Sequence, residues 1–135
     1  MKEMTIAAAV ENIDVVTDFV SEQLEAFDCP MKAQMQISIA IDELFGNIAH
    51  YAYGDSEGDM RLGIGFDKDT NAITFRMADR GIPFDPLKKP DPDITLSAED
   101  REIGGLGIFI TKKTMDCVTY AYENGENILT MIKKI

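Results

Sequence analysis

Tryptophan is absent from this chain of 135 residues, and cysteine occurs only twice. Neither Cys29 nor Cys117 stands in a CxxC or Cys/His cluster, so neither a zinc site nor a disulfide framework is indicated. A bond between these two cysteines stays an open alternative. We expect both of them to be small buried apolar residues instead.

Long hydrophobic runs are also absent. No apolar run approaches the roughly 18 to 20 residues that a membrane-spanning helix needs, and the opening MKEMTIAAAVENID lacks the charged start and long apolar core of a signal peptide. These absences favour a cytoplasmic protein that does not insert into membranes. With 135 residues and 45% hydrophobic content, the sequence suits a single domain over residues 1–135 with a sizeable core.

Basic residues are scarce, since 13 lysines and arginines face 24 acidic residues and the formal net charge is −11. This balance argues against nucleic acid as the main partner, because binding a phosphate backbone requires a basic face. Residues 1–60 carry 12 acids and 2 bases, whereas residues 61–135 carry 12 acids and 11 bases. A phosphate ligand would therefore prefer the second half. The acidic first half is either a solvated face, the simpler interpretation, or a surface for a basic protein.

Two helices are predicted in the first half. Met4 to Val10 is typical of a short strand, and Asn12 suits the N-cap of an amphipathic helix. Pro30 opens a second helix, which should stop near Gly54, where YGDSEGD supplies turn residues. The apolar side of the first helix is formed by Ile13, Val16, Val20, Leu24 and Phe27.

The second half alternates between strands and loops. Residues 61–66 and 73–77 alternate apolar with other residues and predict an antiparallel hairpin. Residues 79–103 hold four of the five prolines and form a long irregular segment, which in a small domain is usually a functional lid or disordered. A short helix from Gly104 to about Asp116 and a hairpin turning at Asn124-Gly125 complete the chain.

This order of elements predicts an α+β fold. The simplest arrangement is a two-layer sandwich, in which about three helices cover one face of a largely antiparallel sheet. The last strand is predicted over Ile128 to Ile135.

A polar stripe interrupts the second helix. At about 100° per residue, Glu43, Asn47 and His50 fall within roughly 60° of one another on one helix face. Apolar residues surround them, so the helix is expected to be buried on most sides, where a carboxylate and an amide need partners. Their oxygens suit Mg²⁺, yet such a pair alone is more often solvated or bonded to backbone. The surrounding residues are Ile37, Ala40, Ile41, Leu44, Phe45 and Ile48.

Two further motifs are weak by themselves. Asp79 follows a strand and precedes Gly81, so its carboxylate could accept a hydrogen bond from an exocyclic amine, although an ordinary Asp-x-Gly turn is the simpler interpretation. The backbone N–H groups of Gly104-Gly105-Leu106-Gly107 at a helix start could hold an anion. Basic residues on or beside the lid and helix could offset phosphate charge. These are Arg80, Lys88, Lys89, Arg101, Lys112 and Lys113.

In combination and in this order, the three motifs are specific. Glu-x3-Asn on a long helix, Asp-x-Gly-x-Pro-Phe-Asp after a hairpin, a lid, and Gly-Gly-Leu-Gly at a helix start resemble the GHKL ATP-binding superfamily. Within that superfamily, the chain is similar to the small stand-alone domains of bacterial anti-sigma factor serine kinases, the SpoIIAB and RsbW type. The likeness covers nearly the whole sequence, including GGLGIFITKKTMDCV.

The resemblance implies ATP and Mg²⁺ as cofactors and assigns roles by position. Asn47 matches the Mg²⁺-coordinating asparagine, and Glu43 the acidic residue that acts as base or orients the nucleophile. Asp79 matches the adenine-binding aspartate, with Gly81 beside it. The glycine motif, comprising Gly104, Gly105, Leu106 and Gly107, matches the segment that holds the phosphates beneath a lid at about residues 86–103.

Two departures from the family pattern qualify these roles. Many relatives carry histidine four residues after the asparagine, where this chain has Tyr51, so His50 should not inherit a catalytic role. Some family kinases place an arginine directly before the glycine motif, where this chain has Ile103 and where Arg101 lies two residues earlier. Phosphoryl transfer is therefore a separate question from nucleotide binding.

Two functions are compatible with this pattern. The resemblance implies an ATP-dependent serine kinase that phosphorylates a STAS-type antagonist protein and also sequesters a sigma factor, and a homodimer is compatible with it. The alternative is a nucleotide-dependent partner-binding switch without kinase activity. A sensor histidine kinase catalytic domain shares the fold, but no helical hairpin with a phospho-accepting histidine precedes it here. An α/β domain without a ligand would gain no stability from Mg-ATP.

Overall fold

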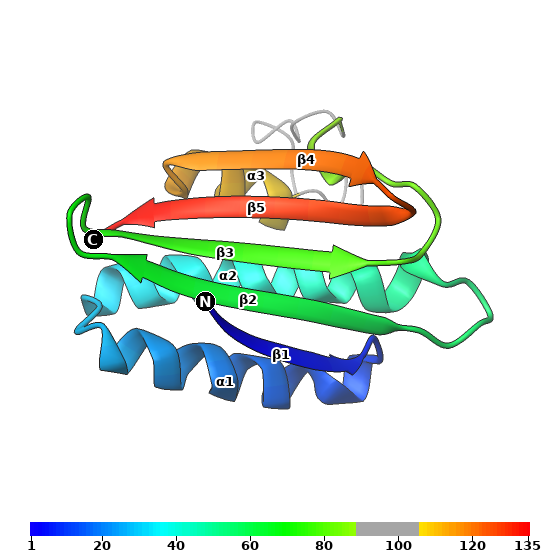
Figure 1. Ribbon diagram of the computed structural model, residues 1–135, viewed down its shortest axis with the longest axis horizontal. Coiled ribbons are helices and arrows are strands. Elements are labelled where there is room, and N and C mark those ends of the chain that lie inside the picture. Colours follow the sequence, from blue (N-terminus) through cyan, green and yellow to red (C-terminus); the bar gives the residue numbers. More distant parts are fainter. Residues whose placement is uncertain (89–105) are drawn as a thin grey trace, which may run out of the picture.

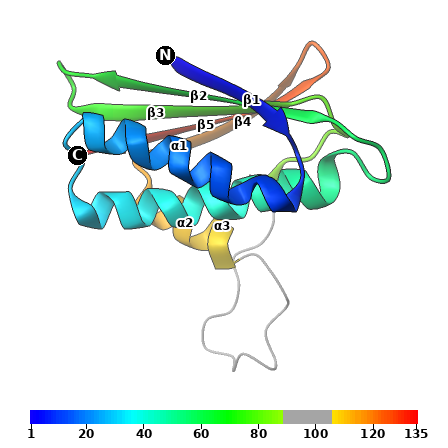
Figure 2. The same ribbon diagram turned by 90° about the horizontal axis from the view of Figure 1, so that it is seen from below.

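One antiparallel sheet joins the strands of the computed structural model, which describes residues 1–88 and 106–135. Its order is β1-β2-β3-β5-β4, and every neighbouring pair is antiparallel. Figures 1 and 2 show the described helices together on one face of this sheet. The strands are β1 (Lys2–Ala7), β2 (Asp59–Asp67), β3 (Ala72–Asp79), β4 (Cys117–Glu123) and β5 (Glu126–Lys134).

The helical layer lies behind the sheet and closes the core. Apolar residues at every second position of β2 and β3 face this layer, because strand side chains alternate between the two faces. Met60, Leu62 and Phe75 are all fully buried there, against Phe45 of the helices. The α+β prediction is thus confirmed. The helices are α1 (Ile13–Ala26), α2 (Met31–Asn47) and α3 (Leu106–Thr114), and the short turns are η1 (Val10–Asn12), η2 (Ile48–Ala52) and η3 (Pro86–Lys88).

The first strand begins and ends earlier than its sequence predicted. It covers Lys2–Ala7 rather than residues 4–10, and Val10–Asn12 form a 3₁₀ turn. Asn12 does precede α1, but its side chain makes no capping bond and instead donates to the Ala7 carbonyl at 2.9 Å. The alanine-rich end of the strand carries no periodicity that could have marked this boundary.

Helix α2 is buried where it packs on the sheet, α1 and α3, and it leaves one apolar row exposed. Its predicted apolar side is confirmed, since Ile37 and Ile41 are fully buried. However, Met31, Met35 and Ile39 are 70%, 62% and 43% exposed. Because these three residues recur every fourth position, they form one apolar row on the solvent side of the helix.

The predicted end of this helical segment near Gly54 is confirmed. Gly54 has a positive φ of 58°, the left-handed conformation that ends many helices. The last part, Ile48–Ala52, is a π-helical turn rather than a continuation of the α-helix. Such turns are rare and occur frequently at functional sites.

The two predicted hairpins are both present. At the second one, Asn124 and Gly125 have φ values of 53° and 78°, as the tight turns that favour Asn-Gly require. In the sheet, Asp79 of β3 pairs with Asn127 of β5, whereas the other end of β5 pairs with Ala72 through Lys134. The carboxyl end of the chain therefore lies at the opposite end of the sheet from Asp79.

The two cysteines differ in environment. Cys29 is buried, and this burial raises the pKa of its thiol. Cys117 is exposed, so the prediction that it is buried was wrong: it lies on the sheet face that the described helices leave open. Both thiols are free. In the described ranges, no helix has the length and apolar content required to cross a bilayer.

Candidate functional site

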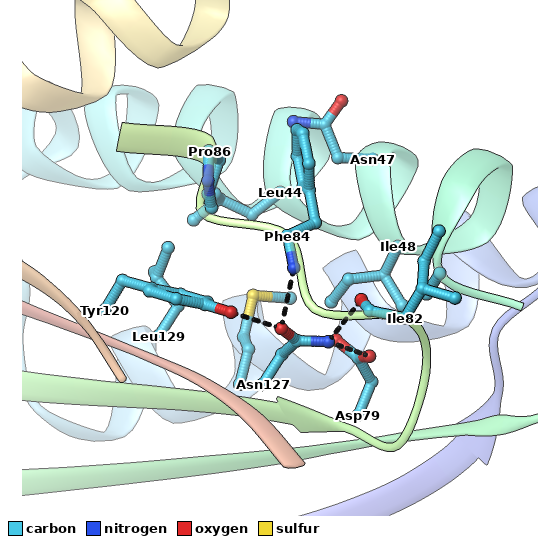
Figure 3. A pocket seen from close by; sticks show the side chains of 12 residues that line it. Leu44, Asn47, Ile48, Asp79, Ile82, Phe84, Pro86, Tyr120, Asn127 and Leu129 are labelled. Carbon is cyan, nitrogen blue, oxygen red and sulfur yellow. Dashed lines mark hydrogen bonds between the residues drawn. The ribbon is translucent and has the colours of Figure 1, made fainter. Parts of the chain in front are cut away.

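A cavity lies where β3 and β5 meet the end of α2 (Figure 3). Asp79 and Asn127 are at its floor, and Asn47 is at the opposite rim. Most of the remaining lining is apolar, which is typical of a pocket for a flat ring with few polar anchors. The cavity is lined by Leu44, Asn47, Ile48, Ala52, Met77, Asp79, Ile82, Phe84, Pro86, Tyr120, Asn127 and Leu129.

Asp79 offers one unused oxygen to this cavity. The residue is only 5% exposed. Its Oδ1 accepts hydrogen bonds from the Gly81 backbone N–H at 2.9 Å and from Asn127 Nδ2 at 3.0 Å. Within residues 1–88 and 106–135, no hydrogen bond reaches Oδ2. A buried carboxylate oxygen without a donor is costly, so this site fits a ligand that donates an N–H group, as an exocyclic amine does.

Asn127 is a cavity residue that the sequence did not reveal. Besides its bond to Asp79, its Nδ2 donates to the Ile82 carbonyl at 2.9 Å. Its Oδ1 accepts from the Phe84 backbone N–H at 3.0 Å and from the Tyr120 hydroxyl. One signal could have revealed it: Asn127 occupies the inward-facing parity of its strand, two residues before a buried leucine, where an amide needs partners.

Gly81 has a steric role beside this carboxylate. A Cβ at this position would lie 2.2 Å from the carbonyl oxygen of Ala52. That carbonyl accepts a hydrogen bond from the Ile82 N–H at 2.8 Å. Glycine is required at this position because the loop after β3 packs directly on the π-helical turn. This contact joins the two sides of the cavity.

Tyr53 joins the same two segments from outside the cavity. Its hydroxyl donates to the Asp59 carbonyl at 2.6 Å and accepts from the Arg80 N–H at 2.9 Å. Burial is the main cause that raises the pKa of this hydroxyl. Gly58 leaves room for the ring, because a Cβ there would lie 2.1 Å from it. The segment that follows Asp79 is thus held at Arg80 and at Ile82.

The structure separates Glu43 from Asn47. Asn47 is half-buried at the cavity rim, where α2 gives way to the π-helical turn. Glu43 is also half-buried but does not line the cavity. It contacts α3 instead, where a Cβ on Gly107 would lie 2.5 Å from its Oε2. In the described part of the chain neither side chain makes a hydrogen bond, so both are available to a ligand.

Only part of the glycine motif can be placed. Leu106 is the first residue of α3 and is 39% exposed, and Gly107 follows it. Gly104, Gly105 and Ile103 lie outside the described residues, as does the predicted lid except for its first residues, 86–88. The N-terminal end of α3 therefore lies beside Glu43, as a phosphate-binding helix start would require.

His50 lies apart from these groups. It is exposed on the π-helical turn, and its ring is 5.9 Å from that of Tyr51. It does not line the cavity.

The donor set also fits a partly solvated Mg²⁺. The described ranges contain no group of three or more His, Cys, Asp or Glu side chains able to cage a metal. Magnesium commonly keeps several waters and takes its remaining ligands from one or two side chains and from substrate phosphates. The amide oxygen of Asn47 at the cavity rim is suited to this arrangement.

A helical layer on one face of an antiparallel sheet, with a buried aspartate at the end of a strand, is the arrangement expected of the GHKL class. The profile of one family, described as the histidine kinase-like ATPase domain, matches residues 6–133. The chain therefore belongs to the histidine kinase-like ATPase family.

Curated relatives of this chain are serine kinases. The serine/threonine-protein kinase BtrW of Bordetella bronchiseptica is 22% identical over 100 residues, which is 74% of this chain and 70% of the relative. The serine-protein kinase RsbW of Bacillus thuringiensis is 29% identical over 97 residues, 69% of this chain. The match spans only 59% of that relative's length.

A solved structure shares the fold. The RsbU and RsbW domains of a Mycobacterium tuberculosis protein give a TM-score of 0.65 at 13% sequence identity. The match covers 99% of this chain and 32% of the other. At this identity the similarity establishes the fold alone.

Proposed function

We propose that this protein is an ATP-dependent serine kinase of the anti-sigma factor type. It would transfer the γ-phosphoryl group of ATP to a serine of a small STAS-type antagonist, and it would also bind a sigma factor in the cytoplasm. The observation that carries ATP binding is the unused oxygen of the buried Asp79 in an apolar cavity. The similarity to serine kinases supports the transfer step.

Each site residue has a distinct task in this proposal. Asp79 Oδ2 would accept a hydrogen bond from the adenine amino group, which selects adenine over a base with a carbonyl there. Asn47 would hold Mg²⁺, which supplies charge neutralisation for the phosphates. Glu43 would orient or deprotonate the incoming serine hydroxyl. Gly104, Gly105, Leu106 and Gly107 would hold the phosphates, although the first two lie outside the described residues.

A thermal shift assay tests nucleotide binding. Mg-ATP at about 100 times its dissociation constant should stabilise the folded protein by about 2.7 kcal/mol. Asp79→Asn should remove most of this shift, because an amide can direct an N–H donor at the adenine amine. An equal shift in both proteins, or none in the wild type, would refute this assignment of Asp79.

A transfer assay tests the kinase activity. Incubation with labelled ATP, Mg²⁺ and the cognate STAS protein should label the STAS protein. Glu43→Gln should abolish labelling while ATP binding stays measurable, since the substitution removes the carboxylate and keeps the shape. Binding without any transfer to a verified partner would contradict the kinase assignment.

A nucleotide-dependent binding switch is the second candidate. It is favoured by Ile103, which stands where some relatives carry an arginine able to reach the terminal phosphate. In this case ATP would change the affinity for a protein partner without transfer. Partner affinity should then differ among the ATP, ADP and nucleotide-free forms, and equal affinity in all three would exclude the switch.

A further inference from the structure

Helix α3 contacts Glu43 of α2 at a glycine, Gly107. A Cβ on Gly107 would lie 2.5 Å from Oε2, 2.6 Å from Cδ and 2.7 Å from Cγ of Glu43. All three distances are below 3.0 Å, which real Cβ atoms essentially never show. The carboxylate of Glu43 and the carbon atoms behind it therefore pack directly on the backbone of the first turn of α3.

Backbone conformation does not explain this glycine. The described glycines with a positive φ are Gly54 and Gly125, so Gly107 has a conformation open to other residues. Glycine also weakens a helix relative to alanine. Gly107 is the second residue of the nine-residue helix α3, so its presence there calls for another cause, and the contact with Glu43 provides one.

The turn around Gly107 is also fixed. Its carbonyl accepts a hydrogen bond from Thr111 Oγ1 at 2.7 Å. Thr111 is fully buried, so the turn cannot shift away from α2 without moving a core residue. A side chain at position 107 must therefore displace Glu43 rather than the helix.

We propose that Gly107 is a positioning residue for Glu43, in addition to its proposed part in holding the phosphates. The missing side chain admits the carboxylate against the first turn of α3, where the helix dipole favours a negative charge. This placement holds Glu43 beside the end of the helix at which the phosphates are expected. The catalytic consequence depends on the proposed kinase function, whereas the steric contact does not.

A stability measurement tests the contact without any activity. Gly107→Ala is made in the wild type and in Glu43→Ala, and the midpoint of thermal unfolding is measured. In the Glu43→Ala background, Gly107→Ala should raise the midpoint by about 3 °C, because alanine stabilises a helix relative to glycine. With Glu43 present, the gain should be smaller, because the Glu43 side chain must first move aside. The same shift in both backgrounds would overturn the proposal.

Gly46 supplies the matched control. It lies in α2, and a Cβ there would meet no atom within 4 Å. Gly46→Ala should therefore raise the midpoint equally with and without Glu43. A dependence of this control on Glu43 would show that the coupling at position 107 is not specific, and would also count against the proposal.

Kinetics then separate positioning from phosphate binding. Gly107→Ala should lower kcat for transfer by about 100-fold, because small misplacement of a reacting group has effects of this size. Any change in the dissociation constant for ATP should be the same in the wild type and in Glu43→Gln, because the contact with Glu43 acts on transfer and not on nucleotide binding. A loss of ATP affinity with kcat unchanged would assign Gly107 to the phosphates alone and overturn the proposal. If the wild type transfers no phosphoryl group, the kinase proposal fails while the thermal measurement still decides the contact.

Discussion

At the scale of single residues, Asn127 connects three parts of the site. Its amide bonds Asp79 of β3, the loop at Ile82 and Phe84, and the hydroxyl of Tyr120 on β4. Because every donor and acceptor of the amide is used, its orientation is fixed. The position of Asp79 Oδ2, the carboxylate oxygen that remains for a ligand, is thereby fixed as well.

Tyr120 should make the stability of this group depend on pH. Burial is the main cause that raises the pKa of its hydroxyl. The neutral hydroxyl therefore contributes stability that is complete below the unfolded pKa of about 10 and is lost as pH rises through the higher folded value. Tyr120→Phe should cost about 1 kcal/mol at pH 8, and the gap to wild type should close above pH ~10.

Urea unfolding between pH 8 and 11 measures this gap. Tyr122→Phe is the control, since Tyr122 is 46% exposed on the same strand. The control should match wild type within about 0.5 kcal/mol throughout. A gap for Tyr120→Phe that stays constant with pH would contradict the linkage.

Gly81→Ala should destabilise the protein by about 1–3 kcal/mol, the usual cost of overpacking. The new methyl group would collide with the Ala52 carbonyl and strain the hydrogen bond from Ile82. Denaturant unfolding gives the change, and Gly46→Ala, which meets open space, serves as comparison. A stable Gly81→Ala protein would show that the loop can move away from the π-helical turn.

At the scale of elements, the β4–β5 hairpin depends on its turn. Gly125→Ala places a side chain at a φ of 78°, where alanine costs about 1–2 kcal/mol. Gly125→Asn should lose less than half as much stability as Gly125→Ala, because asparagine tolerates this conformation better than alanine. Thermal unfolding of both variants tests the order, and equal losses would contradict a conformational cause.

The same scale shows which elements a sequence can predict. Alternation at residues 61–66 and 73–77 identified β2 and β3, and Asn124-Gly125 marked a hairpin, because these signals are local. The end of β1 and the π-helical turn carry no such signal. The sequence made no prediction for the exposed Met31, Met35 and Ile39, since periodicity reports the apolar side of a helix but not how much of it is covered.

The residues of the candidate site divide in the same way, into those with a local sequence signal and those placed by tertiary packing. Glu43, Asn47 and Asp79 were predicted as site residues from their spacing and from resemblance to a family. The contacts of Gly81 with Ala52 and of Gly107 with Glu43 depend on how distant segments pack. Asn127 belongs to the site because antiparallel pairing places it opposite Asp79, and register across a sheet is a tertiary property.

At the scale of the whole molecule, a net charge of −11 should make the fold sensitive to salt. Like charges repel one another more in the compact state, and ions screen that repulsion. On the outer face of α1, Asp14, Asp18 and Glu22 are all exposed at a spacing of four residues, where like charges destabilise a helix.

Raising NaCl from about 10 to 200 mM should therefore raise the thermal midpoint by a few degrees. KCl should have the same effect, because screening depends on ionic strength rather than on the cation. Lys substitution of Asp18 should reduce the shift. A midpoint that falls with salt would indicate that ion pairs outweigh the repulsion.

The path of β5 has a practical consequence for experiments. The strand starts beside Asp79 and its nine residues carry the chain to the other end of the sheet, roughly 25–30 Å away at about 3.3 Å per residue. A surface, a fluorophore or a fused domain attached after Ile135 would stand clear of the cavity. Immobilisation through this terminus should leave the cavity accessible to a ligand.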